Sequence, residues 1–247
     1  MRKESNCLRN ALLNSFFITP KFVLFRLVSI EKLLTADGSH TLFSSKFNEI
    51  YHSRHGAIQE SNHVFVQHGL MQVKTRPIRI FELGFGTGLN AFLAFLFAQN
   101  HSIDVHYEGV ELYPIENDIA QSLNYADELC AGKFKHEFLQ LHTSLWNQSH
   151  QLSVNFTFIK KHISIADYQP AINHFDVIFF DAFAPDVQSE LWSEKMFAKM
   201  YAILKPGGIL CTYCAKGIVR RAMQGAGFVV QRQPGPPGKR EMLVAFK

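Results

Sequence analysis

The clearest chemical signal in the chain is a glycine-rich run between an expected strand and an expected helix. It reads Glu82-Leu83-Gly84-Phe85-Gly86-Thr87-Gly88, after the apolar residues 78–81 and before the apolar residues 89–97. A turn of this kind holds a nucleotide-like ligand against backbone N–H groups. Its spacing is acidic-x-G-x-G-x-G, whereas a dinucleotide fingerprint places G-x-G-x-x-G against a pyrophosphate. The run therefore predicts a ligand with carboxylate and ribose groups, and the alternative is a structural turn in an unrelated α/β protein.

A second acidic residue follows at the distance that such a ligand needs. Glu111 ends the expected strand 104–111 and lies 23 residues after Gly88. In Rossmann-like folds a carboxylate at this place accepts hydrogen bonds from the ribose hydroxyls. The alternative is a solvated strand end. We expect the ribose role, because the glycine-rich run precedes it.

A third position with chemical potential is Asp181, which ends the near-continuous apolar run 175–181 and is followed by Ala182-Phe183-Ala184-Pro185. Side chains at the carboxyl end of a strand in an open sheet face the ligand crevice. A carboxylate there can position an amine and accept its proton. Asp181 is therefore the candidate catalytic residue, and Phe183 is the candidate to stack on a substrate base.

These positions need a sheet to bring them together, and the pattern of the chain supplies one. The expected elements are a hairpin (33–35 and 41–43), a helix (56–68), a strand (78–83), a helix (88–99), a strand (104–111), a helix (114–130), extended runs near 138–141 and 156–165, a strand (175–181), a helix (189–204), a strand (209–213), a helix (216–226) and two strands (228–232 and 241–246). Strand–helix alternation from residue 78 onward predicts a parallel sheet covered on both faces. The closing pair of strands is expected to form an antiparallel edge.

Composition excludes some classes of protein. The 247 residues are 47% hydrophobic and include 23 Phe, which suffices for a packed core and excludes global disorder. The net charge of +4 arises within residues 1–32, which hold six basic and two acidic residues. A polyanion would therefore have to bind a local patch, and the basic stretch 216–247 is the candidate.

Cysteine and histidine positions favour no metal or disulfide site. Four cysteines give no disulfide framework at this length. Cys211 and Cys214 lie three apart on an expected strand, so their side chains point to opposite faces. His52 and His55 are neighbours without an orienting partner. Residues 1–30 are basic, but their apolar stretches are interrupted, so we expect an upstream extension, a mobile arm or a weak transit peptide, peripheral to function.

The glycine-rich run, the later Lys205-Pro206-Gly207-Gly208 before a strand, and the closing hairpin together resemble class I S-adenosyl-L-methionine (SAM) methyltransferases. That resemblance implies an α/β fold, Rossmann-like, with a seven-stranded, mostly parallel sheet whose last strand is antiparallel. It covers residues 78–247 as the methyltransferase domain. Residues 31–77 are then a small hairpin and helix region packing on that core, and residues 1–30 a peripheral extension.

Further stretches resemble one family, the tRNA 5-aminomethyluridine methyltransferases. They are Phe47-Asn48-Glu49, Tyr51, Glu60, Val64-Phe65, the Asp181 segment, 212–221 and 238–243, so the match runs from about residue 36 to the C-terminus. In bifunctional members this half completes 5-methylaminomethyl-2-thiouridine at the tRNA wobble position. The resemblance implies a cytoplasmic, SAM-dependent N-methyltransferase acting on 5-aminomethyl(-2-thio)uridine in the anticodon loop. It implies the stand-alone form, without metal or flavin, and a separate enzyme that supplies the aminomethyl group.

The resemblance also implies roles for single residues. The cofactor-binding residues are Glu82, Gly84, Phe85, Gly86, Gly88, Asn90, Glu111 and Ser164. Ser164 stands near the adenine, where the family often has an acidic residue; Asp167 is displaced from that place. The substrate and tRNA residues are Tyr213, Lys216, Arg220, Lys239 and Arg240, of which the basic ones would meet phosphates. Trp192 could stack on a base but fits the inner face of a helix, which favours the core.

Three other functions compete with this interpretation. A methyltransferase or aminopropyltransferase-like enzyme for a small amine would have an acidic cavity. The presence of Gly84, Gly86, Gly88, Glu111 and Asp181 argues against a SAM-fold RNA-binding module without catalysis. Within the enzyme interpretation, the alternative for Asp181 is that it only holds the cofactor's ammonium group or caps the following turn. A dehydrogenase is disfavoured by the glycine spacing.

Overall fold

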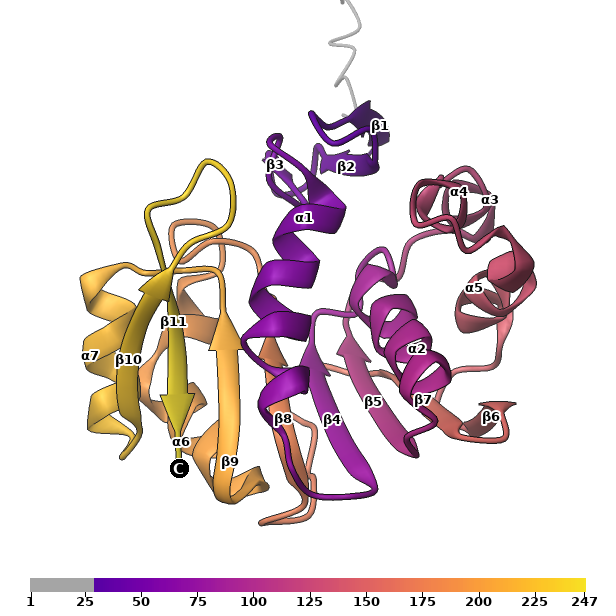
Figure 1. The fold of residues 1–247 in the computed structure, drawn as a ribbon. Coiled ribbons are helices and arrows are strands. Elements are labelled where there is room, and N and C mark those ends of the chain that lie inside the picture. Colours follow the sequence, from indigo (N-terminus) through magenta and orange to yellow (C-terminus); the bar gives the residue numbers. More distant parts are fainter. Residues whose placement is uncertain (1–28) are drawn as a thin grey trace, which may run out of the picture.

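The computed structural model describes residues 29–247, so the expected N-terminal extension lies almost wholly outside the described residues. The described chain builds one large sheet of eight strands (Figure 1). In spatial order these are β10 (Val229–Pro234), β11 (Glu241–Phe246), β9 (Leu204–Thr212), β8 (Phe175–Phe180), β4 (Ile78–Leu83), β5 (Val105–Glu111), β7 (Phe156–His162) and β6 (Ser149–Ser153). The five strands from β9 to β7 are parallel to one another.

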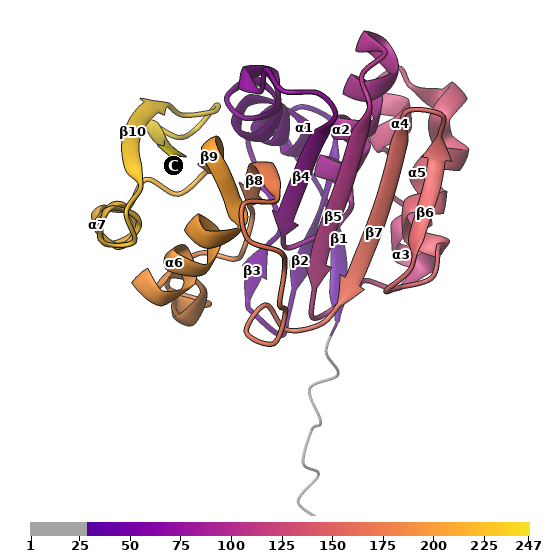
Figure 2. The ribbon, with the colours of Figure 1, turned by 90° about the horizontal axis from the view of Figure 1, so that it is seen from below.

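Helices cover both faces of this sheet, as Figure 2 shows from below. One face carries α1 (Ala57–Ser61), the π-helix η1 (Asn62–Gln67), α2 (Leu89–His101) and α5 (Lys135–Thr143), with α3 (Asn117–Gln121) and α4 (Tyr125–Glu128) packed against α5. The other face carries α6 (Glu194–Ile203) and α7 (Gly217–Gly225). Two hydrophobic layers therefore lie on either side of the sheet, and β8, apolar except for Asp176, is buried at every residue between them.

The predicted fold class is confirmed, with one strand more than expected. β11 is antiparallel to both of its neighbours, as predicted for the last strand. The additional strand is β6, which pairs antiparallel with β7 at the far edge. Its sequence, Ser149-His150-Gln151-Leu152-Ser153, buries only Leu152. An edge strand with one apolar residue shows too little alternation to be recognised from sequence.

The N-terminal part forms a small sheet of its own beside the large one. The predicted hairpin is confirmed as β1 (Ile30–Leu34) and β2 (His40–Ser44), and a short strand β3 (Glu49–Ile50) pairs with β2. The predicted helix 56–68 is confirmed as α1 continuing into η1. This helical segment runs along one face of the sheet, packed against β9 and α2, and residues 47–60 lie at the carboxyl ends of the strands (Figure 1).

Three predicted elements were wrong. Residues 138–141 are helical rather than extended, because Phe138, Leu141 and His142 in α5 bury one face at helical spacing. The helix expected over 114–130 is instead the two short helices α3 and α4, which begin after Pro114. The helix expected over 189–204 is a 3₁₀ turn, η4 (Ser189–Trp192), followed by α6.

The break before α6 has a local cause. Ser193 is extended, and its hydroxyl oxygen accepts a hydrogen bond from the Met196 N–H at 3.3 Å. An N-cap serine starts a new helix at this point, because it satisfies one of the N–H groups that a helix leaves free.

The cysteine prediction agrees with the fold. Cys211 packs in the layer with α2, and Cys214 in the opposite layer with α6. Among residues 29–247 no group of three His, Cys, Asp or Glu side chains is arranged to hold a metal ion. Within the same residues no helix combines the length and apolar character needed to cross a membrane.

Candidate active site

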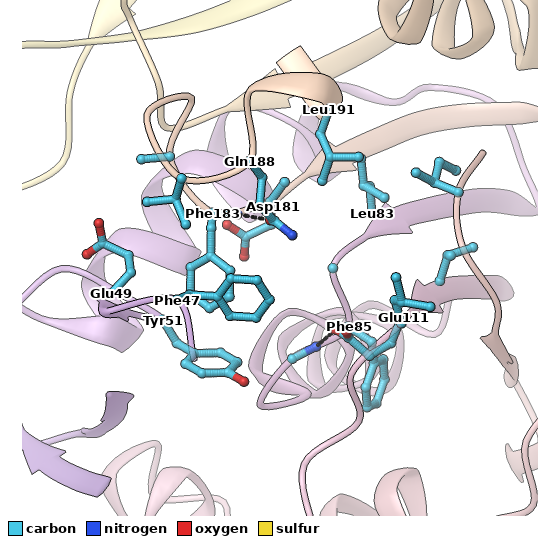
Figure 3. A pocket seen from close by; sticks show the side chains of 18 of the residues that line it. Phe47, Glu49, Tyr51, Leu83, Phe85, Glu111, Asp181, Phe183, Gln188 and Leu191 are labelled. Carbon is cyan, nitrogen blue, oxygen red and sulfur yellow. Dashed lines mark hydrogen bonds between the residues drawn. The ribbon is translucent and has the colours of Figure 1, made fainter. Parts of the chain in front are cut away.

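A cavity of about 1260 Å³ lies where the carboxyl ends of β4, β5 and β8 meet the N-terminal segment 47–60. Figure 3 shows Phe85 and Glu111 on one side of it, and Phe47, Tyr51 and Phe183 gathered on the other. Carboxyl ends of parallel strands form the ligand crevice of an open α/β sheet, because the connections there diverge. The cavity therefore divides into a side built by the glycine-rich turn and a side built by aromatic residues.

The glycine-rich turn needs its glycines for conformation and for space. Gly84, Gly86 and Gly88 have φ values of +93°, +48° and +71°. A Cβ on Gly84 would lie 2.4 Å from the Asp181 carbonyl oxygen, and one on Gly88 would lie 2.7 Å from His142 Nε2. Positive φ strains any residue with a Cβ. The backbone of the turn can consequently lie close to β8 and to a ligand.

Glu111 holds this turn in place while leaving its carboxylate partly open. Its Oε2 accepts a hydrogen bond from the Gly86 N–H at 3.0 Å, and its Oε1 accepts one from the Tyr113 N–H at 2.8 Å. Each carboxylate oxygen has a second lone pair. Glu111 lines the cavity, so these lone pairs are placed to accept from a vicinal diol such as that of a ribose.

A buried amide links the two acidic positions. Asn90, at the start of α2, donates from Nδ2 to Glu82 Oε1 at 2.9 Å and to Asp181 Oδ2 at 2.8 Å. Because Glu82 and Asp181 both accept from Nδ2, the orientation of the amide is fixed. A flipped amide would place the Oδ1 acceptor against the acceptor oxygens of both acidic side chains. Asn90 thereby connects the end of β4 with the end of β8.

The carbonyl oxygen of the same amide, Asn90 Oδ1, is free to accept a hydrogen bond, so it can be compared with the donor groups of SAM. Asn90 Oδ1 is buried and has no hydrogen-bond partner among residues 29–247. A buried carbonyl oxygen without a donor is costly, so a ligand that brings an N–H group would satisfy it. An amino-acid ammonium group at Asn90 and a ribose at Glu111 match the two polar ends of SAM, and the glycines leave room between them. The residues present fit this cofactor.

Asp181 is the carboxylate with the most perturbed environment on the cavity wall. Burial raises its pKa to about 7; the nearby Glu60 charge adds to the rise, while the Asn90 hydrogen bond and Lys239 oppose it. Glu82, fully buried beneath, also has its pKa raised well above the ordinary value, chiefly by burial. A carboxyl group that titrates near neutral pH can exchange a proton with an amine.

The aromatic side of the cavity is assembled from two distant segments. The Phe183 ring lies with its centroid 4.8 Å from that of Phe47 and 5.1 Å from that of Tyr51. All three side chains are half-buried and line the cavity. Trp192 is 96% buried and donates from Nε1 to the Phe183 carbonyl at 2.8 Å. The prediction that Trp192 belongs to the core is confirmed, and its indole holds the Phe183 segment.

The predicted tRNA-contacting residues divide into two groups. Tyr213 and Lys239 line the cavity: the Tyr213 hydroxyl donates to the Ala182 carbonyl at 2.8 Å, and Lys239 pairs with Glu60. Lys216, Arg220 and Arg240 do not line the cavity; Lys216 and Arg240 are exposed, and Lys216 pairs with Asp186 at 2.5 Å. The structure thus brings Lys239 to the side of Asp181 rather than to the open surface.

The loop after β7 contains Ser164, the residue predicted to lie near the adenine. Ser164 lines the cavity and Asp167 does not, in agreement with the expected displacement of the acidic residue. The Ser164 hydroxyl accepts from the Ala166 N–H at 3.2 Å. Phe85 lines the cavity beside the glycines. The contact with adenine stays a prediction.

Residues 99–247 match a family model described as S-adenosyl-L-methionine-dependent methyltransferase. The chain belongs to this family. The MnmC proteins of Methylobacillus flagellatus and Chromohalobacter salexigens, named tRNA 5-methylaminomethyl-2-thiouridine biosynthesis bifunctional proteins, are each 30% identical to it. The alignments cover 81% and 84% of this chain but 33% and 31% of those proteins. The chain therefore spans about a third of the length of these relatives.

A solved structure extends the similarity to three dimensions. The crystal structure of MnmC2 from Aquifex aeolicus has a TM-score of 0.70 and 26% sequence identity, and the match covers 90% of this chain and 71% of that one. The match therefore extends beyond residues 99–247, which match the family model. The chain is accordingly a SAM-dependent methyltransferase, and SAM is its cofactor.

Two histidines of this methyltransferase site were not predicted as functional. His142 donates from Nε2 to the Thr87 carbonyl at 3.0 Å, and His52 Nε2 lies 3.4 Å from the Thr87 hydroxyl. Burial lowers the pKa of each to about 4, so both are neutral. They hold Thr87, between Gly86 and Gly88, at its carbonyl and at its hydroxyl group. Nothing in the local sequence around either histidine signals this, because the contacts span 35 and 55 residues.

Proposed function

We propose that the chain methylates the amine of 5-aminomethyl(-2-thio)uridine at the wobble position of tRNA. The observation that carries this proposal is Asp181, a carboxyl group with a pKa of about 7 beside the aromatic cluster of Phe47, Tyr51 and Phe183. The names of the relatives support it, since both describe biosynthesis of 5-methylaminomethyl-2-thiouridine in tRNA.

The proposed chemistry assigns each side of the cavity a task. When bound, SAM supplies an electrophilic methyl group on its sulfonium. Glu111 and the Gly84–Gly88 turn would hold its ribose, and Asn90 Oδ1 would accept a hydrogen bond from its ammonium group. A protonated amine has no lone pair to attack, so Asp181 takes its proton. The neutral nitrogen would then be placed to accept the methyl group that bound SAM supplies.

The aromatic side suits a base that has left the anticodon stack. A pyrimidine ring stacked on Phe183 would carry its aminomethyl group toward Asp181, which precedes Phe183 by two residues. Single-stranded RNA bases are commonly recognised by stacking on aromatic side chains. Lys216, Arg220 and Arg240 lie outside the cavity and are proposed to meet the anticodon-stem phosphates.

The proposal extends to organisation and partners. We assign residues 78–247 as the methyltransferase domain and residues 31–77 as the segment that closes the substrate side of its cavity. A tRNA substrate implies a cytoplasmic location. It also requires a further activity that delivers the primary amine, since methyl transfer cannot form the aminomethyl group.

The test is methylation of a defined RNA. Purified protein is incubated with SAM and a tRNA that carries 5-aminomethyluridine at the wobble position, and the nucleosides are analysed by mass spectrometry. We expect 5-methylaminomethyluridine from wild type, with a rate that rises through about pH 7 as Asp181 ionises, and a rate lower by about 10²–10⁴-fold from Asp181→Asn. SAM binding without any methylated nucleoside would exclude this function.

One observation favours a second candidate, a small amine substrate. Five carboxylate residues line the cavity, namely Glu49, Glu60, Glu111, Asp181 and Glu190. Acidic walls suit a free polyamine, although Arg54, Lys195, Lys199 and Lys239 line the same cavity. Methylation of free amines in the absence of RNA, at a rate above that for tRNA, would support this candidate instead.

A further inference from the structure

The loop between β10 and β11 carries a lysine into the substrate side of the cavity. Lys239 Nζ contacts Glu60 Oε1 on α1 and lies 4.0 Å from the centroid of the Tyr213 ring. Glu60 is buried, and its Oε2 accepts a hydrogen bond from the Ser53 N–H at 2.7 Å. A carboxylate and an aromatic face therefore fix the ammonium from two sides.

The loop itself is held against the N-terminal segment at two further points. His63 Nε2 donates to the Pro234 carbonyl at 2.8 Å, where β10 ends. Gly238 lies so close to His55 that a Cβ would be 2.0 Å from its ring. The fold of the loop therefore determines where Lys239 lies, and its side chain is not free to move on the surface.

The Lys239 ammonium is connected to Asp181 through Tyr213. The Tyr213 hydroxyl donates to the carbonyl of Ala182, the residue that follows Asp181. Glu60, Lys239, Tyr213 and Asp181 all line the same cavity. One negative and one positive charge thus face the candidate base from elements that are far apart in the sequence.

Resting on the proposed function, we propose that Glu60 and Lys239 are positioning residues that hold Asp181 ready to take the proton of the substrate amine. Neither residue needs to touch the reacting atoms. Lys239 keeps Glu60 from repelling the Asp181 carboxylate, and Glu60 keeps Lys239 from neutralising it in a direct ion pair.

The groups that face Asp181 determine what each substitution does. Glu60 raises the pKa of Asp181 and Lys239 lowers it. From β4, Glu82 also faces this region, and burial raises its own pKa well above the ordinary value; from α2, Asn90 donates a hydrogen bond that lowers the Asp181 pKa. Removal of either partner of the pair leaves the other uncompensated. Removal of the Glu60 charge and removal of the Lys239 charge must therefore shift the pKa of Asp181 in opposite directions.

The first experiment measures the proton equilibrium without cofactor or substrate. The protein is labelled with ¹³C at the aspartate carboxyl carbons, and the Asp181 signal is assigned by its loss in Asp181→Asn. We expect a titration midpoint near pH 7 in wild type, lower by about half a unit or more in Glu60→Gln and higher by a similar amount in Lys239→Met. Lys239→Arg keeps the charge and should restore the wild-type midpoint.

Lys205→Met is the matched control. Lys205 pairs with Asp176 at 2.7 Å, and its side chain is 34% exposed against 4% for its partner; the values for Lys239 and Glu60 are 31% and 8%. Asp176 and Asp181 are five residues apart on an extended strand, about 16 Å. Lys205→Met removes a comparable ion pair and should leave the Asp181 midpoint unchanged, although it lowers stability.

The second experiment follows methyl transfer to tRNA against pH. The midpoint of the rate profile should move with the same signs, and the effect should appear in kcat at a given pH rather than in KM for tRNA. Equal Asp181 midpoints in wild type, Glu60→Gln and Lys239→Met, or shifts of the same sign, would overturn the inference. Absence of methylated tRNA with wild type would overturn the proposed function alone, since the carboxyl titration needs no substrate.

Discussion

Strand β8 has an aspartate near each end, and the two differ in every contact. Asp176, at the amino end, accepts from the Thr75 hydroxyl at 2.8 Å, the Arg79 N–H at 2.8 Å and Lys205 Nζ at 2.7 Å. Asp181, just past the carboxyl end, accepts from the Asn90 amide, and no salt bridge among the described residues includes it. One carboxylate is fully paired; the other faces a cavity.

The difference shows how position in the sheet decides what an aspartate does. At the amino end, Asp176 joins the segment before β4 and the start of β9 to β8, and a lysine balances its charge. At the carboxyl end the connections diverge and leave a cavity; Asp181 is half-buried there without a cation in contact, and desolvation raises its pKa to about 7. The first carboxylate stabilises the fold, and the second is available for proton transfer.

Replacement of Asp181 should separate activity from stability most strongly. Asp181→Asn keeps an acceptor for Asn90 but cannot take a proton, so we expect kcat to fall by about 10²–10⁴-fold. Because folding raises the pKa of this carboxyl, its ionisation destabilises the native state above pH 7, and the variant should have a higher Tm than wild type at about pH 8. Methylation assays and thermal unfolding measure the two effects. An inactive variant that is also less stable than wild type would contradict the view that Asp181 serves the chemistry at a cost in stability.

Asp176→Ala should show the reverse pattern. It leaves Lys205 and the Arg79 N–H without their acceptor, and breaking a buried ion pair costs roughly 3–5 kcal/mol. We expect this loss in urea unfolding, with kcat of the folded fraction close to wild type. Loss of kcat at full folding would show that the amino end of β8 also serves the chemistry.

Gly84→Ala tests the close approach that places Asp181 over the glycine-rich turn. The new Cβ would meet the Asp181 carbonyl oxygen, and φ at this residue is +93°. Strain of this kind costs about 1–3 kcal/mol, and we expect at least a tenfold weaker affinity for SAM by calorimetry. Gly132→Ala is the control, because nothing lies within 4 Å of its added Cβ. Unchanged SAM binding in Gly84→Ala would contradict the assigned turn.

The two histidines around Thr87 predict acid sensitivity at the carboxyl ends of the strands. Folding lowers the pKa of His52 and His142 from 6.5 to about 4, so the unfolded chain binds protons that the native state excludes. Stability is therefore complete above about pH 6.5 and should fall by about 1 kcal/mol per histidine on acidification to about pH 5.5. Urea unfolding of His142→Gln and of wild type at the two pH values measures how much of this loss of stability is due to His142. An equal pH dependence in both proteins would refute it.

The smallest effect is expected at the surface pair of Lys216 and Asp186. Their side chains are 45% and 80% exposed, so Lys216→Met should change the free energy of unfolding by less than about 1 kcal/mol. If Lys216 meets a phosphate, affinity for tRNA should fall and its salt dependence should become weaker. Unchanged affinity at low salt would remove Lys216 from the proposed interface.

The sequence alone determined the features that depend on short-range patterns. The glycine spacing, the acidic ends of β4 and β5, the apolar run of β8 and the antiparallel closing strand were all predicted, because periodicity and turn chemistry are local. Local patterns failed where they were weak, as at the edge strand β6, or where two short helices replaced a long one.

Only the tertiary structure decided which side chains share the cavity. Glu60 and Lys239 meet across 179 residues, Thr87 is held by two histidines from distant segments, and Phe47 reaches Phe183 from the small N-terminal sheet. From the sequence, Lys239 is interpreted as a surface charge. The structure shows that the loop between β10 and β11 carries it into the cavity. The physical reason is that burial and charge at Asp181 arise from segments brought together by the packing of the sheet, and no spacing along the chain encodes those distances.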